Sequence, residues 1–235
     1  MKKTIKKLTT WRVGDYVLQL SVVIVGVLVT FIVSDAVSER AKAKEVAKAM
    51  EIVKSELEQN NKNLIDITER ISFEQNAGRY VLRYEKQLGN AAVDSLQLYL
   101  KVPFHIRSLE FTNDALEMLK ASSLIQQVRD KELILQIMRA YNRLKEAKET
   151  VAWYYNMKES YWTKLSDDSF YIRQDEKLKQ ENDVYKIWEH RLGNIHVHNI
   201  LHFVVTGLPD FEAALKDTQH ILNRTIERIG QEYEQ

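Results

Sequence analysis

The chain has 235 residues, 34 Lys and Arg against 33 Asp and Glu, a formal net charge of +1, and no cysteine. The missing cysteine excludes disulfides and thiolate chemistry. The first sixteen residues carry a charge of +4, which leaves −3 for the rest of the chain. Because this remainder is nearly neutral, its charge gives no reason to expect nucleic-acid binding. With only 7 Gly and 2 Pro, helices should dominate.

The first predicted element is an uncharged apolar run from Tyr16 to Ser34. As a helix it reaches roughly 28 Å, close to the roughly 30 Å hydrocarbon core of a bilayer. A cleavable signal peptide is the alternative, but its apolar core is shorter, and the stretch from Ser34 to Glu39 offers no clean small-x-small cleavage site. We therefore predict a basic tail at 1–15, a transmembrane helix at 16–34 and a helical domain at 35–235.

Basic side chains before this run set the expected orientation. They lie close to it, whereas the cations on the other flank begin farther away and are mixed with acids. By the positive-inside rule, the amino terminus is cytoplasmic and the main domain is extracytoplasmic. The basic side chains of the tail are Lys2, Lys3, Lys6, Lys7 and Arg12.

Small and polar side chains share one face of the predicted span. Gln19, Gly26 and Thr30 lie within about 40° of one another on a helix, with Ser34 flanking them. Such a stripe permits close helix approach, which favours a homo-oligomer seam. One alternative is that this stripe lines a pore. The other is that these residues fall on one face by chance in an anchor helix that does not associate.

The helix should continue past the span, because no Gly or Pro interrupts 27–77. Asn60 occupies an a position of its heptad pattern, where a buried amide fixes register in a coiled coil. A parallel coiled coil between protomers and the first helix of an intramolecular bundle share this spacing, and we favour the bundle. The seam consists of Val46, Met50, Val53, Leu57, Asn60, Leu64, Ile67 and Ile71.

The remaining elements complete an all-α fold, a single amino-terminal transmembrane helix that continues into a long-helix bundle. Lys158 interrupts the apolar pattern of the longest soluble helix. After a stop at Asn76-Ala77-Gly78, we predict a helical stretch over 79–101, interrupted or bent at Gly89-Asn90, and then a non-helical segment over 104–111. A short helix capped by Thr112 or Asp114 follows, up to a joint at Ser122-Ser123. The last predicted helices cover 130–165, 170–192 after a polar turn at 166–169, 195–206 and 211–235.

Several stretches resemble a known family. The run VIVGVLVTFIV leads into Ser38-Glu39-Arg40, and LEMLKASSLI at 116–125 precedes Asp130-Lys131-Glu132-Leu133 at the start of the long helix. This order is similar to a family of small single-span proteins of Bacteroidota-type bacteria, catalogued as a domain of unknown function. The resemblance implies the same architecture in the bacterial inner membrane and transfers no active site.

Four histidines lie within thirteen residues of the sequence: His190, His196, His198 and His202. His198 and His202 are four apart on a predicted helix, a spacing that can place two imidazoles on one metal ion. A site needs a third ligand, and no His-Glu-x-x-His motif or cysteine supplies one. We therefore expect no metal or other cofactor, and ordinary polar positions for this pair.

Aromatic residues crowd the end of the long helix, and two of them, Trp153 and Trp162, lie off its buried stripe. They are candidates for binding an unidentified protein partner, because Trp is enriched in binding hot spots. Packing against a second layer of the bundle is the alternative.

The motifs of catalysis are missing. The sequence contains no Gly-rich phosphate loop, nucleophile elbow or catalytic triad pattern, so we expect no enzyme. The predicted function is a membrane-anchored protein that acts through self-association or partner binding, with the lipid bilayer as its environment. An oligomeric pore and a ligand- or metal-binding sensor are the rival hypotheses.

Overall fold

The computed structural model describes residues 2–206 and 211–233, without the side chains of 2–20, 26, 28–29 and 31–36. Its described residues are all-α and contain no strand, as predicted. The elements are α1 (Lys2–Arg83), η1 (Leu88–Asn90), α2 (Val93–Tyr99), η2 (Val102–Phe104), α3 (Asp114–Ala121), α4 (Leu124–Gln127), α5 (Lys131–Ser166), α6 (Ser169–Glu181), α7 (Val184–Leu192), α8 (Ile195–Thr206) and α9 (Phe211–Tyr233).

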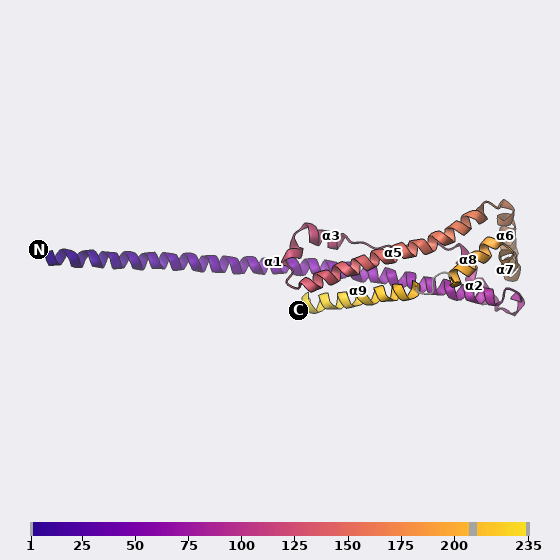
Figure 1. The fold of residues 1–235 in the computed structure, drawn as a ribbon, viewed down its shortest axis with the longest axis horizontal. Coiled ribbons are helices and arrows are strands. Elements are labelled where there is room, and N and C mark those ends of the chain that lie inside the picture. Colours follow the sequence, from indigo (N-terminus) through magenta and orange to yellow (C-terminus); the bar gives the residue numbers. More distant parts are fainter. Residues whose placement is uncertain (1, 207–210, 234–235) are drawn as a thin grey trace.

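Helix α1 is a single element of 82 residues, about 120 Å long. Its amino-terminal half projects alone, and its second half belongs to the bundle, beginning near the buried Val46 (Figure 1). The predicted continuity between 16–34 and the bundle is confirmed. Within the described residues, no helix is long and apolar enough to cross a membrane. Most side chains of the predicted span lie outside that described part.

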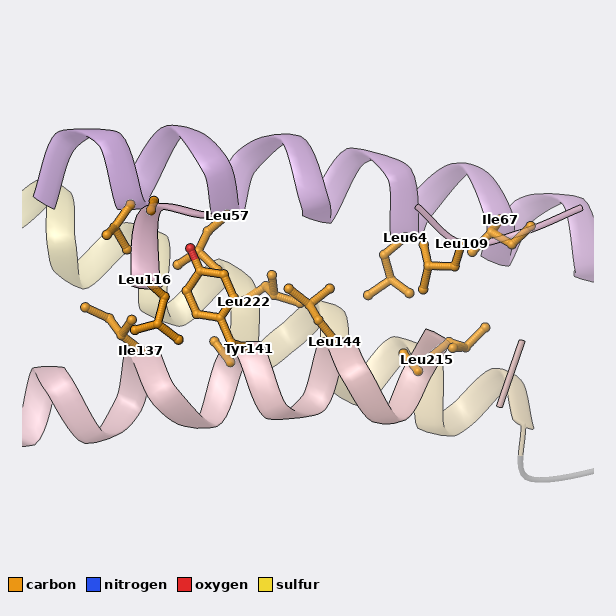
Figure 2. Packing of buried hydrophobic residues seen from close by; sticks show 14 of the residues in the cluster. Leu57, Leu64, Ile67, Leu109, Leu116, Ile137, Tyr141, Leu144, Leu215 and Leu222 are labelled. Carbon is orange, nitrogen blue, oxygen red and sulfur yellow. The ribbon is translucent and has the colours of Figure 1, made fainter. Parts of the chain in front are cut away.

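The bundle is built on α1, α5, α8 and α9. Helices α1 and α5 run in the same direction, and α8 and α9 return in the opposite direction, each contacting both (Figure 1). Leucines such as Leu57, Leu144 and Leu222 point into the shared interior (Figure 2). The heptad seam of α1 is therefore buried within one chain, as the bundle interpretation requires. The predicted inward positions of α9 are also buried: Phe211, Leu215, Thr218, Leu222, Thr225 and Ile229.

Two predicted helix boundaries are wrong. Helix α1 does not stop at Gly78 but continues to Arg83. Gly78 instead permits close packing, because a Cβ there would lie 2.9 Å from Val205 Cγ2 and 3.3 Å from the Leu201 carbonyl of α8. The helix predicted over 170–192 is broken into α6 and α7 at Asn182, which adopts the left-handed conformation with φ of 56°.

A non-helical segment, residues 105–113, runs back along α1 and is called the strap below. Polar side chains of α1 bind its backbone in place of regular secondary structure. The Asn60 amide accepts from the Thr112 N–H (3.0 Å) and donates to the Thr112 carbonyl (2.8 Å), and Asn63 donates to the Glu110 carbonyl (3.0 Å). Farther along, Glu56 accepts from the Ala115 N–H at the start of α3. Three backbone groups of the strap thus have side-chain partners on α1.

The end of the bundle farthest from the amino terminus, called the distal end, has its own core. Here α2, α6 and α7 gather around the last turns of α1 and α5 (Figure 1). Trp188 is fully buried, and its indole N–H donates to the Leu96 carbonyl at 2.9 Å. The buried members of this distal core are Val81, Ala91, Leu96, Leu165, Tyr171, Val184, Trp188, Val197 and Leu201.

Candidate functional site: a cleft at the distal end

A cleft of about 730 Å³ opens at the distal end between η2, α5, α6 and α7. This volume lies in the range of small-molecule and side-chain binding sites. Its walls combine apolar and aromatic side chains with a few charged ones. The lining residues are Leu100, Lys101, Phe104, His105, Trp162, Leu165, Ser166, Tyr171, Ile172, Asp175, Glu176, Lys179 and Arg191.

A buried ion pair forms one wall of the cleft. Arg191 donates through Nε and Nη2 to both carboxylate oxygens of Asp175, at 2.8 and 3.2 Å, and its Nη1 donates to the Leu100 carbonyl. Its guanidinium also lies 4.8 Å from the centre of the Phe104 ring. Burial raises the pKa of the Asp175 carboxyl, but hydrogen bonds from Arg191 and Lys179 outweigh it, so the net pKa lies below the ordinary value. This wall is preformed and charged.

Tyr171 contributes an unsatisfied polar group to the same cleft. Its side chain is buried, and among the described residues its hydroxyl has no hydrogen-bond partner. Its ring stacks on His190 at 4.4 Å between centroids, which fixes its orientation. Burial chiefly, and then the Asp175 charge, raises the pKa of the hydroxyl, so it stays protonated at neutral pH and can donate. A buried polar group without a partner is costly, but the hydroxyl oxygen has almost no accessible surface, so an acceptor in the cleft could reach it only after a local shift of the surrounding side chains.

The two predicted partner-binding tryptophans have different surroundings. Trp162 is 42% exposed and lines the cleft. Trp153 is 46% exposed, but its ring packs edge-on against Phe203 of α8 at 5.7 Å between centroids. Nine residues apart on α5, they face opposite sides of the helix. Trp162 is therefore positioned to contact an occupant of the cleft, and Trp153 is not.

Below the cleft lies a buried charged network that the sequence did not predict. Lys158 and Glu74 form an ion pair of 2.6 Å with both side chains fully buried. Burial lowers the pKa of Lys158, and the Glu74 charge opposes that shift. Lys158 also donates to two backbone carbonyls, Val102 at 3.0 Å and His105 at 2.7 Å. The network positions η2 and His105, one margin of the cleft. The other groups bonded to Glu74 are Arg70, Tyr154 and Tyr155.

The remaining predicted site residues lie elsewhere. Of the helix-association stripe, Thr30 is exposed on the projecting part of α1, while the side chains of Gln19, Gly26 and Ser34 lie outside the described residues. Asn60 is buried and uses its amide on the strap, within its own chain.

The structure does bring His198 and His202 together. Their rings lie 4.5 Å apart between centroids on one face of α8. The other two histidines of the cluster are not part of this pair, since His190 stacks on Tyr171 and His196 lies two residues before His198 on another face.

Comparison of the chain with protein-family models, with curated proteins and with solved structures gave no match in any of the three. The resemblance noted from the sequence therefore stays a prediction.

Proposed function

We propose that this chain is a single-span protein of the bacterial inner membrane whose helical bundle binds a protein partner through the distal cleft. The observation that carries the proposal is the placement of two features on one continuous helix. Helix α1 has the apolar run near its amino terminus and ends beside the elements that build the cleft (Figure 1). The bundle therefore holds its cleft away from the anchor.

Exposed apolar side chains support the membrane anchor. Val22, Val23, Ile24 and Val25 are 64, 61, 50 and 58% exposed on the projecting part of α1. Successive helical residues point in directions about 100° apart, so these four cover the full circumference of the helix. A helix that is apolar on all sides needs an apolar environment, and the uncharged run around these residues has the length of a bilayer core.

The chemistry of the cleft indicates the kind of partner. Trp162 and Phe104 offer aromatic surface and Lys101 adds positive charge, whereas Lys179 is already paired with Asp175. A matching segment presents a large apolar side chain to the two aromatic rings, with an acidic residue placed to reach Lys101. Interfaces of this kind concentrate their binding energy in a buried aromatic contact surrounded by polar groups.

Site-specific photo-crosslinking in living cells tests this proposal. A benzophenone amino acid would replace Trp162 in the full chain, with replacement of Trp153 as the matched control. Both are half-exposed tryptophans of α5, and only Trp162 lines the cleft. We expect a discrete adduct of higher mass from position 162 and none from position 153.

The mass of the adduct identifies the partner. An adduct with another protein supports partner binding, and an adduct at twice the mass of the chain supports self-association through the cleft. Absence of an adduct, or equal adducts from both positions, would contradict the proposal.

A further inference from the structure

We propose that Glu85, His198 and His202 form a binding site for a divalent transition-metal ion of the zinc type. Their candidate ligand atoms, one carboxylate oxygen and two imidazole nitrogens, all lie within 4.8 Å of one another. The two histidines are neighbours on α8, and Glu85 follows the end of α1. The third ligand, missing from the sequence motif, thus comes from a residue 113 positions away.

The distances suit a tetrahedral ion. Ligands about 2.0–2.1 Å from zinc in tetrahedral geometry are separated by about 3.3 Å. His198 Nε2 and Glu85 Oε2 already lie 3.2 Å apart. The His202 ring, 4.5 Å from the His198 ring between centroids, reaches the same point by rotation of an exposed side chain. Two imidazoles and one carboxylate are a common zinc ligand set that leaves a fourth position for water or a further ligand.

The packing of α8 on α1 holds the three ligands in register. Gly78 allows the backbones to approach so closely that a Cβ there would lie 2.9 Å from Val205 Cγ2. Glu85 lies seven residues after Gly78, in the turn that follows the last helical residue Arg83, and His198 lies seven residues, about two helical turns, before Val205 on α8. The chain runs in opposite directions along α1 and α8. Residues that follow Gly78 therefore lie beside residues that precede Val205, and Glu85 lies opposite His198.

Solvent and metal can reach the site. The Glu85 and His198 side chains are each 32% exposed. Both line a cleft of about 570 Å³ that is separate from the cleft with Trp162 and also includes Tyr185 and Glu189. A bound ion would link the end of α1 to α8 and so stabilise the distal end of the bundle. This inference does not depend on the proposed partner.

Zinc titration of the full chain in detergent, followed by calorimetry, tests the site. The variants are H202Q and E85Q, with H220Q as the matched control because His220 is an exposed histidine of α9 outside this cluster. We expect one equivalent of Zn²⁺ to bind the wild-type chain and H220Q with equal affinity. Loss of one of three ligands should weaken binding at least roughly tenfold in H202Q and E85Q. Mg²⁺, which prefers oxygen ligands and water, should not bind.

Thermal unfolding provides a second readout that separates binding from folding. Zinc should raise the melting temperature of the wild-type chain and of H220Q, and leave that of H202Q and E85Q unchanged. If H202Q without metal has a lower melting temperature than the wild type, the test of zinc binding rests on E85Q, because its amide retains the shape and hydrogen-bonding capacity of the carboxylate. Absence of stoichiometric zinc binding to the wild-type chain, or undiminished binding to both E85Q and H202Q, would overturn the proposal.

Discussion

Lys158 Nζ lies 2.6 Å from Glu74 Oε2, and neither side chain has any exposed surface. The pair joins α5 to α1 inside the bundle, where Lys158 also donates to the carbonyls of Val102 and His105. Every donor of the ammonium group therefore has an acceptor. The pair anchors the chain as it passes from η2 into the strap, so it fixes the position of the distal cleft relative to the bundle.

Replacement of Lys158 by Met should destabilise the protein strongly. The substitution removes the buried cation of Glu74, which keeps only the partly exposed Arg70, and leaves two carbonyls without a donor, at a cost of about 3–5 kcal/mol. Urea unfolding of the bundle, expressed from Ala41 onward, measures the loss. The double variant Glu74→Leu with Lys158→Met should recover part of it, because no uncompensated charge remains. A single variant as stable as the wild type would contradict this role of the pair.

Glycine 78 should be intolerant of a methyl group, whereas Gly89 should accept one. A Cβ on Gly78 would lie 2.9 Å from Val205 Cγ2, so Gly78→Ala should cost about 1–3 kcal/mol through overpacking. A Cβ on Gly89 meets nothing within 4 Å, and no glycine among the described residues has a positive φ. Gly89→Ala should therefore be neutral or slightly stabilising. Thermal unfolding of the two variants compares them, and equal effects would argue against tight α1–α8 packing.

Asn60→Leu should lower stability without changing the mass of the protein in detergent. The substitution removes both hydrogen bonds to Thr112, an exposed residue whose N–H and carbonyl can bind water instead, at about 0.5–1.5 kcal/mol for each bond. Asn63→Ala, which removes an exposed contact to the strap, should cost less. Unfolding and native mass spectrometry give the two readouts. An altered oligomeric state would instead support the coiled-coil hypothesis for Asn60.

The Asp175 carboxylate should contribute to the acid sensitivity of the bundle. Its pKa in the folded protein lies below the ordinary 3.8, because hydrogen bonds from Arg191 and Lys179 outweigh burial, which alone would raise it. Its contribution is therefore complete above pH about 3.8 and is lost as the pH falls through the lower folded value. Asp175→Asn should be less stable than the wild type at pH 7, and the difference should shrink towards pH 2. Urea unfolding at both pH values checks this, and a constant difference would contradict it.

Helical periodicity allowed much of the fold to be predicted. The buried positions of α9 and the seam of α1 follow from spacings of three and four residues, which depend only on local geometry. The break at Asn182 was missed because left-handed asparagine ends a helix without any change in hydrophobic pattern. Gly78 was misjudged because glycine serves both helix ends and close packing, and only the position of α8 distinguishes them.

The candidate sites depend on contacts between distant parts of the sequence, so most of them could not be predicted from the sequence. Lys158 was visible as an interruption in an apolar stripe, but its partner Glu74 lies 84 positions away. Trp162 and Trp153 look equivalent in the sequence, and only the positions of η2 and α6 show that Trp162 lines a cleft. The cleft itself could not be predicted, since Tyr171 and Arg191 meet only through the packing of α6 on α7.

Membrane extraction tests the central claim, that α1 anchors the bundle in a bilayer, most directly. Membranes from cells producing the full chain, or a chain beginning at Ala41, would be washed with alkaline carbonate and separated by centrifugation. The full chain should remain in the membrane pellet, and the shorter chain, which retains the bundle from Val46 onward, should be in the supernatant. Recovery of the full chain in the supernatant would contradict the anchor and the function built on it.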